Sequence, residues 1–119
     1  NLTATGDVLG SPLFMSPEQC MGGKIDLRSD IYSLGCVMYE ALCGIPPFKG
    51  DNSVQVIFKH MNEMPPRPTM VNPNILKPQA IEQALFRCLQ KKPEARFATM
   101  EDLQQELLKQ AEIHAIFAQ

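Results

Sequence analysis

Proline positions constrain this 119-residue chain more than any other feature of its sequence. Because proline lacks a backbone N–H and disfavours a helical conformation in the residue before it, the ten prolines limit where helices can run. Residues 1–28 also contain four glycines and no sustained hydrophobic period, so we expect an ordered loop there, with at most a short helix near residues 17–21. The prolines leave four long stretches free: 18–45, 48–64, 79–92 and 94–119.

The first of these stretches predicts a central helix. Ser29 or Asp30 can cap its start, and Gly44 followed by two prolines ends it. Apolar residues occur on nearly all of its sides, which is typical of a helix in the middle of a fold. These residues are Ile31, Leu34, Val37, Met38, Tyr39, Ala41 and Leu42.

Three further helices are expected. One runs from about residue 52 to 61 with Asp51 or Asn52 as its cap, and its apolar side is formed by Val54, Ile57, Phe58 and Met61. The proline-rich residues 64–74 should be irregular, and the next helix runs from about 78 to 90, buried through Ile81, Leu85, Cys88 and Leu89. Thr99 and Asp102 form an approximate capping box before a last helix that reaches at least residue 113. No strand pattern competes, so the expected fold class is all-α.

Composition excludes several classes of function. A 45% share of hydrophobic residues predicts one globular unit, and the net charge of −2 without runs of like charge argues against nucleic acid as a partner. No apolar run approaches the roughly 20 residues of a membrane span, so we expect no membrane contact from this segment. The four cysteines lack CxxC spacing, which favours free thiols in the cytoplasm. Because the chain begins at Asn1 rather than Met, we expect it to be part of a longer protein.

Few residues suggest chemistry by themselves. His60 and His114 both lie in predicted helices and are expected to be surface residues rather than catalytic ones. Gly22-Gly23-Lys24 lacks the upstream glycine and following helix of a phosphate-binding loop. The sequence contains no cluster of His, Cys and carboxylate residues that would predict a metal site. The residues alone therefore predict a mainly helical domain preceded by a constrained loop.

Three motifs in order carry a resemblance to a known family. They are "GSPLFMSPEQ" (residues 10–19), "DLRSDIYSLGCVMYEALCGIPPFKGD" (26–51) and "KKPEARFATMEDLQQEL" (91–107). They resemble the end of the activation segment, the central helix of the large lobe and the closing Pro-x-x-Arg segment of eukaryotic-like Ser/Thr protein kinases, and their wording is most similar to the bacterial branch. The resemblance implies the helical C-terminal subdomain of the kinase large lobe, with residues 1–28 as activation segment and substrate floor and 29–119 as helical scaffold.

The resemblance also implies roles for individual residues. The substrate-binding residues are those that would face the substrate residue after the phosphorylated one: Gly10, Ser11, Pro12, Leu13 and Phe14. Ser11 stands where the family more often has threonine, and this hydroxyl faces the catalytic aspartate. Glu18 and Arg96 correspond to a structural ion pair, and Asp30 corresponds to the aspartate that anchors the catalytic loop. Thr3 and Thr5 lie where such kinases take activating phosphates.

The sequence departs from a whole kinase domain in what it lacks. The Gly-rich loop, the strand lysine with its helix glutamate, the catalytic-loop aspartate and the Asp-Phe-Gly motif are all missing, so no catalytic residue is expected in this chain. ATP and Mg²⁺ are expected for the intact parent, and none bound to this fragment, which should be inactive alone. The expected partners are a protein substrate, the missing N-terminal kinase portion and a second copy through self-association. A non-catalytic, kinase-like interaction module is the alternative.

Overall fold

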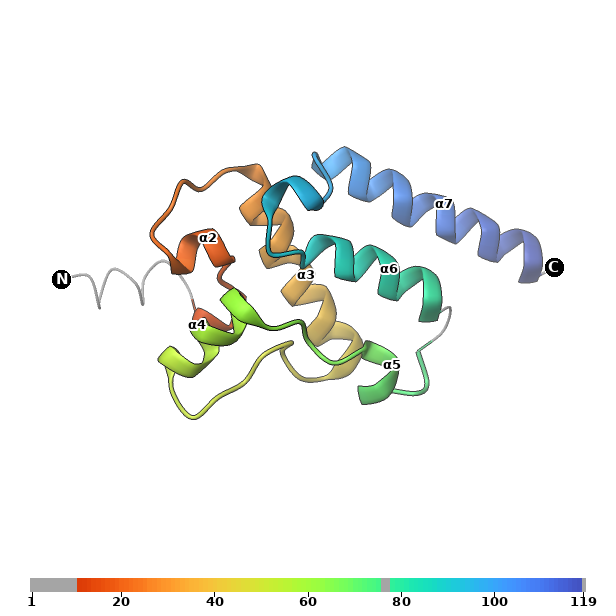
Figure 1. The fold of residues 1–119 in the computed structure, drawn as a ribbon. Coiled ribbons are helices and arrows are strands. Elements are labelled where there is room, and N and C mark those ends of the chain that lie inside the picture. The colour runs from red at the N-terminus through yellow and green to blue at the C-terminus, as the bar shows by residue number, and fades with distance from the viewer. Residues whose placement is uncertain (1–10, 76–77, 119) are drawn as a thin grey trace.

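The protein is built from helices alone in the part that the computed structural model describes, residues 11–75 and 78–118. The expected all-α fold is therefore confirmed, and the four predicted helices correspond to α3, α4, α6 and α7 (Figure 1). The elements are η1 (Pro12–Phe14), α2 (Pro17–Cys20), α3 (Leu27–Cys43), α4 (Ser53–Asn62), α5 (Pro68–Val71), α6 (Pro78–Cys88), η2 (Pro93–Ala95) and α7 (Met100–Ala118).

Helix α3 begins three or four residues before the positions that we predicted, because its cap is neither Ser29 nor Asp30. Asp26 is the N-cap: its side chain accepts a hydrogen bond from the Arg28 N–H at 2.8 Å, and the Ser29 hydroxyl lies 3.4 Å from the Asp26 backbone nitrogen. This reciprocal capping box gives partners to the backbone amides of Arg28 and Asp26 at the start of the helix. Ser29 and Asp30 therefore lie within the first turn. Gly44 ends α3 as predicted, with a φ of 78° that favours glycine.

Helix α3 runs through the middle of the molecule, and the other elements pack around it (Figure 1). Its contact with α6 is close because Gly35 has no side chain: a Cβ there would lie 2.8 Å from the Cys88 Cβ. The apolar residues on nearly all sides of α3 suggested burial all round, and this expectation was wrong, since Val37 is 50% exposed and Ala41 is also exposed. The core instead forms two clusters, one of Tyr32, Cys36, Tyr39, Leu85 and Leu89, the other of Ile31, Ala84, Cys88, Phe97 and Leu103.

Helix α4 turns a different face to the core from the one that we predicted. Asn52 caps it as expected, but Val54 and Phe58 are 75% and 58% exposed. Val56 and His60 are buried instead, against η1 and α2. The side with fewer apolar residues is buried because the His60 ring finds two hydrogen-bond partners there, whereas apolar periodicity ignores such partners.

The proline-rich residues 64–74 were expected to be irregular, and this was wrong for residues 68–71, which form the short helix α5. Pro68 occupies the first helical turn, where a missing N–H costs nothing. The Thr69 N–H and hydroxyl donate to the Glu82 carboxylate at 3.0 and 2.8 Å, so α6 supplies the acceptor for the start of α5. Proline therefore starts a helix here instead of preventing one.

Helix α7 starts as the sequence predicted, with the Thr99 hydroxyl accepting a hydrogen bond from the Asp102 N–H at 3.0 Å. It is the long helix at the top of Figure 1, and it extends beyond the rest of the fold at the C-terminus. Among the described residues, no helix combines the length and the apolar character that crossing a membrane requires.

Candidate functional site

Residues 11–14 form a tight turn that the sequence specifies locally. The Ser11 hydroxyl accepts a hydrogen bond from the Leu13 N–H at 3.2 Å, and the Ser11 carbonyl accepts one from the Phe14 N–H at 3.1 Å. Pro12 fits the first position of the resulting 3₁₀ turn because its φ is already fixed. Ser11 is exposed, so its hydroxyl is accessible from solvent.

Helix α2 follows this turn directly and brings Glu18 to the interior. Ser16 and Gln19 form a capping box: the Gln19 N–H donates to the Ser16 hydroxyl at 3.2 Å, and the Ser16 N–H donates to the Gln19 side chain at 2.7 Å. Pro17 takes the first helical position. These local preferences fix the direction of the Glu18 side chain, which is 8% exposed.

Arg96, which lies just after η2, meets Glu18 in a bidentate ion pair. Its Nη1 lies 2.6 Å from Glu18 Oε2, and its Nη2 lies 2.8 Å from Glu18 Oε1. The pairing of two parallel donors with two carboxylate oxygens is the strongest geometry that these groups can adopt. The sequence resemblance expected these two residues to pair, and the structure brings them together.

The remaining donors of Arg96 are also used. The Nε–H donates to the Gln90 carbonyl at 2.7 Å, while Nη1 and Nη2 donate to the carbonyls of Arg28 and Lys91 at 3.0 and 3.1 Å. All five N–H groups of the guanidinium therefore have acceptors, which a buried arginine requires. One side chain thus joins α2, the start of α3 and the segment after α6.

The Glu18 carboxylate is held in its charged form. Burial by itself raises the pKa of Glu18, but the hydrogen bonds from Arg96 and from the Ser29 hydroxyl, at 2.7 Å, outweigh it and lower this pKa to about 2. The guanidinium carbon of Arg96 also lies 5.0 Å from the centre of the Tyr32 ring. The pair is therefore charged and fully hydrogen-bonded at neutral pH.

His60 is the functional candidate that the sequence analysis missed, and its expected place on the surface was wrong. The ring is 0% exposed, with Nε2 3.1 Å from the Leu13 carbonyl oxygen and Nδ1 2.8 Å from the Tyr32 hydroxyl. Since a carbonyl only accepts, the Nε2 atom carries the proton, and Nδ1 accepts from Tyr32. Nothing in the apolar pattern of α4 distinguished this histidine, because both of its partners come from other segments.

The charge state of His60 follows from its surroundings. Burial, together with the nearby Lys91 ammonium, lowers the pKa of His60 to about 4, so the ring is neutral near pH 7. The Lys91 Nζ lies 3.5 Å from the Tyr32 hydroxyl and 4.6 Å from the centre of the Phe48 ring. Burial likewise lowers the pKa of Lys91 to about 8.

A second side chain holds the same turn. The Ser33 hydroxyl of α3 donates to the Phe14 carbonyl at 2.6 Å, next to the carbonyl that His60 holds. Two consecutive carbonyls of the turn are therefore bound from two different helices. This arrangement fixes both the position and the orientation of residues 13 and 14.

The other expected site residues have a different status. Asp30 lies in the first turn of α3 with an exposed side chain, and none of the hydrogen bonds within the described residues involves its carboxylate. Thr3, Thr5 and Gly10 fall outside the residues that the structure describes. The four cysteines carry free thiols, as expected.

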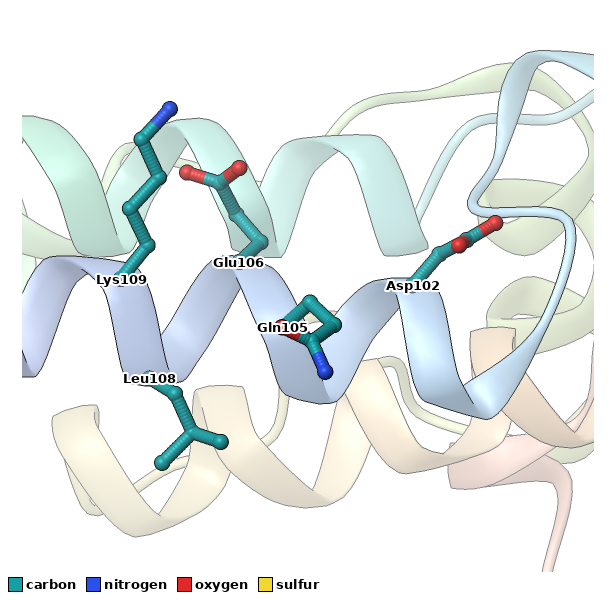
Figure 2. Close-up of a pocket in the computed structure, with 5 residues that line it drawn as sticks. All are labelled: Asp102, Gln105, Glu106, Leu108 and Lys109. Atoms are coloured by element: carbon teal, nitrogen blue, oxygen red, sulfur yellow. The ribbon is translucent and has the colours of Figure 1, made fainter.

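Hollows elsewhere on the surface offer less chemistry. The one shown in Figure 2, about 410 Å³, is lined by side chains of α7 alone: Asp102, Glu106 and Lys109 point to one side of the helix, and Leu108 points to the other. Another, about 220 Å³, is almost entirely apolar and lies where α3, α6 and α7 meet. Within the described residues no group of three or more His, Cys, Asp or Glu side chains could hold a metal ion.

Comparison with known proteins gives a consistent result. Residues 1–108 match the protein kinase domain family. The chain is 43% identical over 96 residues to the DNA damage-responsive serine/threonine-protein kinase RqkA of Deinococcus radiodurans, covering 81% of this chain and 14% of that protein. It is 41% identical over 106 residues to the serine/threonine-protein kinase pkn3 of Myxococcus xanthus, covering 89% and 19%.

A third relative is the serine/threonine-protein kinase PknB of Mycobacterium leprae, with 38% identity over 109 residues, covering 92% of this chain and 17% of that protein. The chain thus spans less than a fifth of the length of each of these relatives. The matched region includes the turn at residues 11–14, the Glu18–Arg96 pair and His60.

Proposed function

The chain belongs to the protein kinase family, as a fragment of the bacterial Ser/Thr type, and we propose that it is the C-terminal portion of a working kinase. The longer parent would transfer the γ-phosphate of ATP to serine or threonine residues of a protein substrate. Residues 1–28 would supply the activation segment, and residues 29–119 would supply the helical scaffold behind it. We propose that the parent phosphorylates its substrate in the cytoplasm.

We assign substrate binding to residues 10–14, which we call the substrate-facing segment. The observation that carries this proposal is that residues 11–14, of which Ser11 is exposed and the others are half-buried, are held by a local turn and by side chains of α3 and α4. A surface turn with no role in binding gains little from such fixed carbonyls, whereas a protein substrate requires a preorganised surface. The exposed Ser11 hydroxyl would face the catalytic aspartate of the parent.

The Glu18–Arg96 pair would connect this segment to the scaffold. It joins α2, which directly follows the turn, to the segment before α7. Asp30, exposed at the start of α3, would anchor the backbone of the catalytic loop in the parent. The surface that this loop would cover is then open in the fragment, for which we propose reduced stability or self-association.

ATP and Mg²⁺ would bind outside this chain. The described residues do not fit a magnesium site, because they contain no suitable group of carboxylates, histidines or thiols. We propose that the nucleotide, the metal and the catalytic base are held by a preceding part of the parent, and that the fragment alone transfers no phosphate. Phosphorylation of Thr3 or Thr5 would activate the parent by adding negative charge to the activation segment.

The test is a phosphorylation assay on the full-length parent with ATP, Mg²⁺ and a serine peptide. We expect transfer to the peptide, and we expect the double variant Thr3→Ala, Thr5→Ala to reduce the rate. Ser53→Ala, which removes an exposed hydroxyl at the start of α4, is the matched control and should leave the rate unchanged. No transfer by the unmodified parent would overturn the proposal.

One observation favours a second function, that of a non-catalytic interaction module. Val54 and Phe58 expose large apolar side chains one turn apart on α4, as a protein-binding helix would. The coding sequence upstream of Asn1 separates the two functions. A His-Arg-Asp motif followed by Asp-Phe-Gly supports the kinase, and a start codon close to Asn1 supports the module.

A further inference from the structure

We propose that His60 is a positioning residue for substrate recognition: it fixes the Leu13 carbonyl and thereby the surface that meets the substrate residue after the phosphorylated one. This inference rests on the proposed function of residues 10–14 as the substrate-facing segment. It adds a residue of α4, distant in the sequence, to the determinants of substrate specificity.

The contact geometry assigns each ring nitrogen one task. Nε2–H donates to the Leu13 carbonyl at 3.1 Å, and Nδ1 accepts from the Tyr32 hydroxyl at 2.8 Å. The Tyr32 ring is itself 0% exposed in the central cluster of α3. The neutral His60 ring therefore links the Leu13 carbonyl to Tyr32, which lies in the buried core of the fold.

The orientation of α4 indicates that this contact is more than core filling. The helix leaves Val54 and Phe58 exposed and buries His60, although burying the apolar side chains would release more free energy through the hydrophobic effect. A buried imidazole is stable only when both nitrogens are paired, and one of its two partners is the substrate-facing segment. The helix is thus oriented so that this contact forms.

Loss of the contact should tilt the segment without releasing it. Ser33 would still hold the Phe14 carbonyl, and the Ser11 carbonyl would still accept from the Phe14 N–H. With the Leu13 carbonyl free, the peptide between Leu13 and Phe14 is held through its N–H alone, so its orientation is less fixed. The expected consequence is weaker and less selective binding of protein substrate, with nucleotide binding unchanged.

Two substitutions separate the tasks of the ring. The side-chain nitrogen of His60→Gln can take the place of Nε2 and donate to Leu13, whereas the shorter His60→Asn can replace only Nδ1 and accept from Tyr32. Tyr39→Phe is the matched control, because it removes a hydrogen bond of another buried side chain, from Tyr39 to the Pro66 carbonyl at 2.8 Å, away from the segment. All three variants keep the polar or aromatic character of the site.

The measurement is the steady-state kinetics of the full-length parent with two serine peptides that differ only in the residue after serine. We expect His60→Asn to raise the peptide KM by about two- to tenfold, the range that one neutral hydrogen bond supports, and to reduce the difference between the peptides. The KM for ATP should not change. His60→Gln and Tyr39→Phe should stay close to the unmodified protein in both respects.

Two results would overturn the proposal. One is a His60→Asn variant whose peptide KM and selectivity match those of Tyr39→Phe. The other is an equal loss in His60→Gln and His60→Asn, since this would point to general destabilisation and not to the Leu13 contact. Tm values for each variant identify any loss that comes from unfolding.

Hydrogen exchange distinguishes a failure of this inference from a failure of the proposed function. The Phe14 and Met15 amides donate to the Ser11 and Pro12 carbonyls within the turn, at 3.1 and 3.3 Å, so their exchange reports its order without any catalysis. We expect these amides to exchange about tenfold faster in His60→Asn than in His60→Gln. Equal rates would overturn the positioning role even if the parent is an active kinase. An inactive parent with unequal rates would overturn the proposed function, and with it the link to substrate, but not the ordering of the turn by His60.

Discussion

The Glu18 carboxylate and the Arg96 guanidinium, 78 positions apart in the sequence, form two hydrogen bonds of 2.6 and 2.8 Å. Arg96 is 2% exposed and also donates to three backbone carbonyls, so it neutralises a buried charge and orders the segments around it. This contact joins the part of the chain that would meet substrate to the helices that support it.

Removal of either partner should strongly destabilise the fold. Arg96→Ala leaves the Glu18 carboxylate buried without its cation, and we expect the free energy of unfolding to fall by about 3–5 kcal/mol. Glu18→Gln keeps the shape but leaves the guanidinium charge unpaired, with a loss in the same direction. Chemical denaturation monitored by far-ultraviolet circular dichroism measures both changes.

The matched control is Arg67→Ala. Arg67 also pairs with a glutamate, Glu82, at 3.1 Å, but its side chain is 65% exposed, so the loss should stay below about 1 kcal/mol. An unchanged denaturation midpoint for Arg96→Ala, or equal effects of Arg67→Ala and Arg96→Ala, would contradict the structural role of the buried pair.

Stability should fall in acid in two steps. Burial and Lys91 lower the pKa of His60 from 6.5 to about 4, so the unfolded chain binds more protons in this range and the fold loses stability as pH decreases from 6.5. By pH 4 the loss from this group is about 3 kcal/mol. Glu18, with its pKa lowered from 4.5 to about 2, adds a second loss as pH falls from 4.5 towards 2.

Denaturation curves at successive pH values test this account. The non-titrating variant His60→Gln should lose most of the dependence between pH 6.5 and 4 and keep the dependence below 4.5. The account of His60 is wrong if this variant retains the full dependence between pH 6.5 and 4.

The close approach of α3 and α6 predicts a cost for a single methyl group. In Gly35→Ala the new Cβ would lie 2.8 Å from the Cys88 Cβ, which can move only with its helix. Overpacking of this kind costs about 1–3 kcal/mol, and alanine returns up to about 1 kcal/mol of helix propensity, so we expect a net loss of about 1–2 kcal/mol. Val37→Ala, on the exposed side of α3, should cost less. A Gly35→Ala protein as stable as the original would show that the helices can separate freely.

The cysteines should differ in reactivity. Cys36 and Cys88 are 0% exposed, and burial raises the pKa of each thiol to about 12, whereas Cys20 and Cys43 are only partly buried. With a thiol reagent at pH 8, we expect Cys20 and Cys43 to be labelled first, and Cys36 and Cys88 only as fast as the protein opens. Peptide mass spectrometry resolves the four sites. Labelling of Cys36 or Cys88 as fast as Cys20 would show that the central cluster is not closed.

The sequence predicted the helices well where local signals act alone. Proline placement, the caps at Asn52 and Thr99, and Gly44 located four helices to within a few residues. It was less informative about which face of a helix is buried, because that depends on partners from other segments. Val54 was expected inside and is 75% exposed, since the two hydrogen bonds of His60 determine how α4 is oriented.

The candidate site shows the same division. Glu18 and Arg96 were found through motifs, because both members of the pair have fixed neighbours in the sequence. His60 and Ser33 were missed because each binds a backbone carbonyl. Since every residue has such a carbonyl, the sequence does not show which one will be bound. The short helix α5 was missed for a similar reason, since its acceptor is Glu82 on α6.

The most direct test of the central claim is phosphate transfer to a serine peptide by the full-length parent, compared with its Ser11→Ala variant. Ser11 is exposed and its hydroxyl only caps a three-residue turn, so the substitution should change stability by less than about 1 kcal/mol. If residues 10–14 face the substrate of a Ser/Thr kinase, the parent transfers phosphate and Ser11→Ala lowers kcat/KM by at least about tenfold. A parent that transfers no phosphate, or a variant that transfers it equally well, would contradict the account.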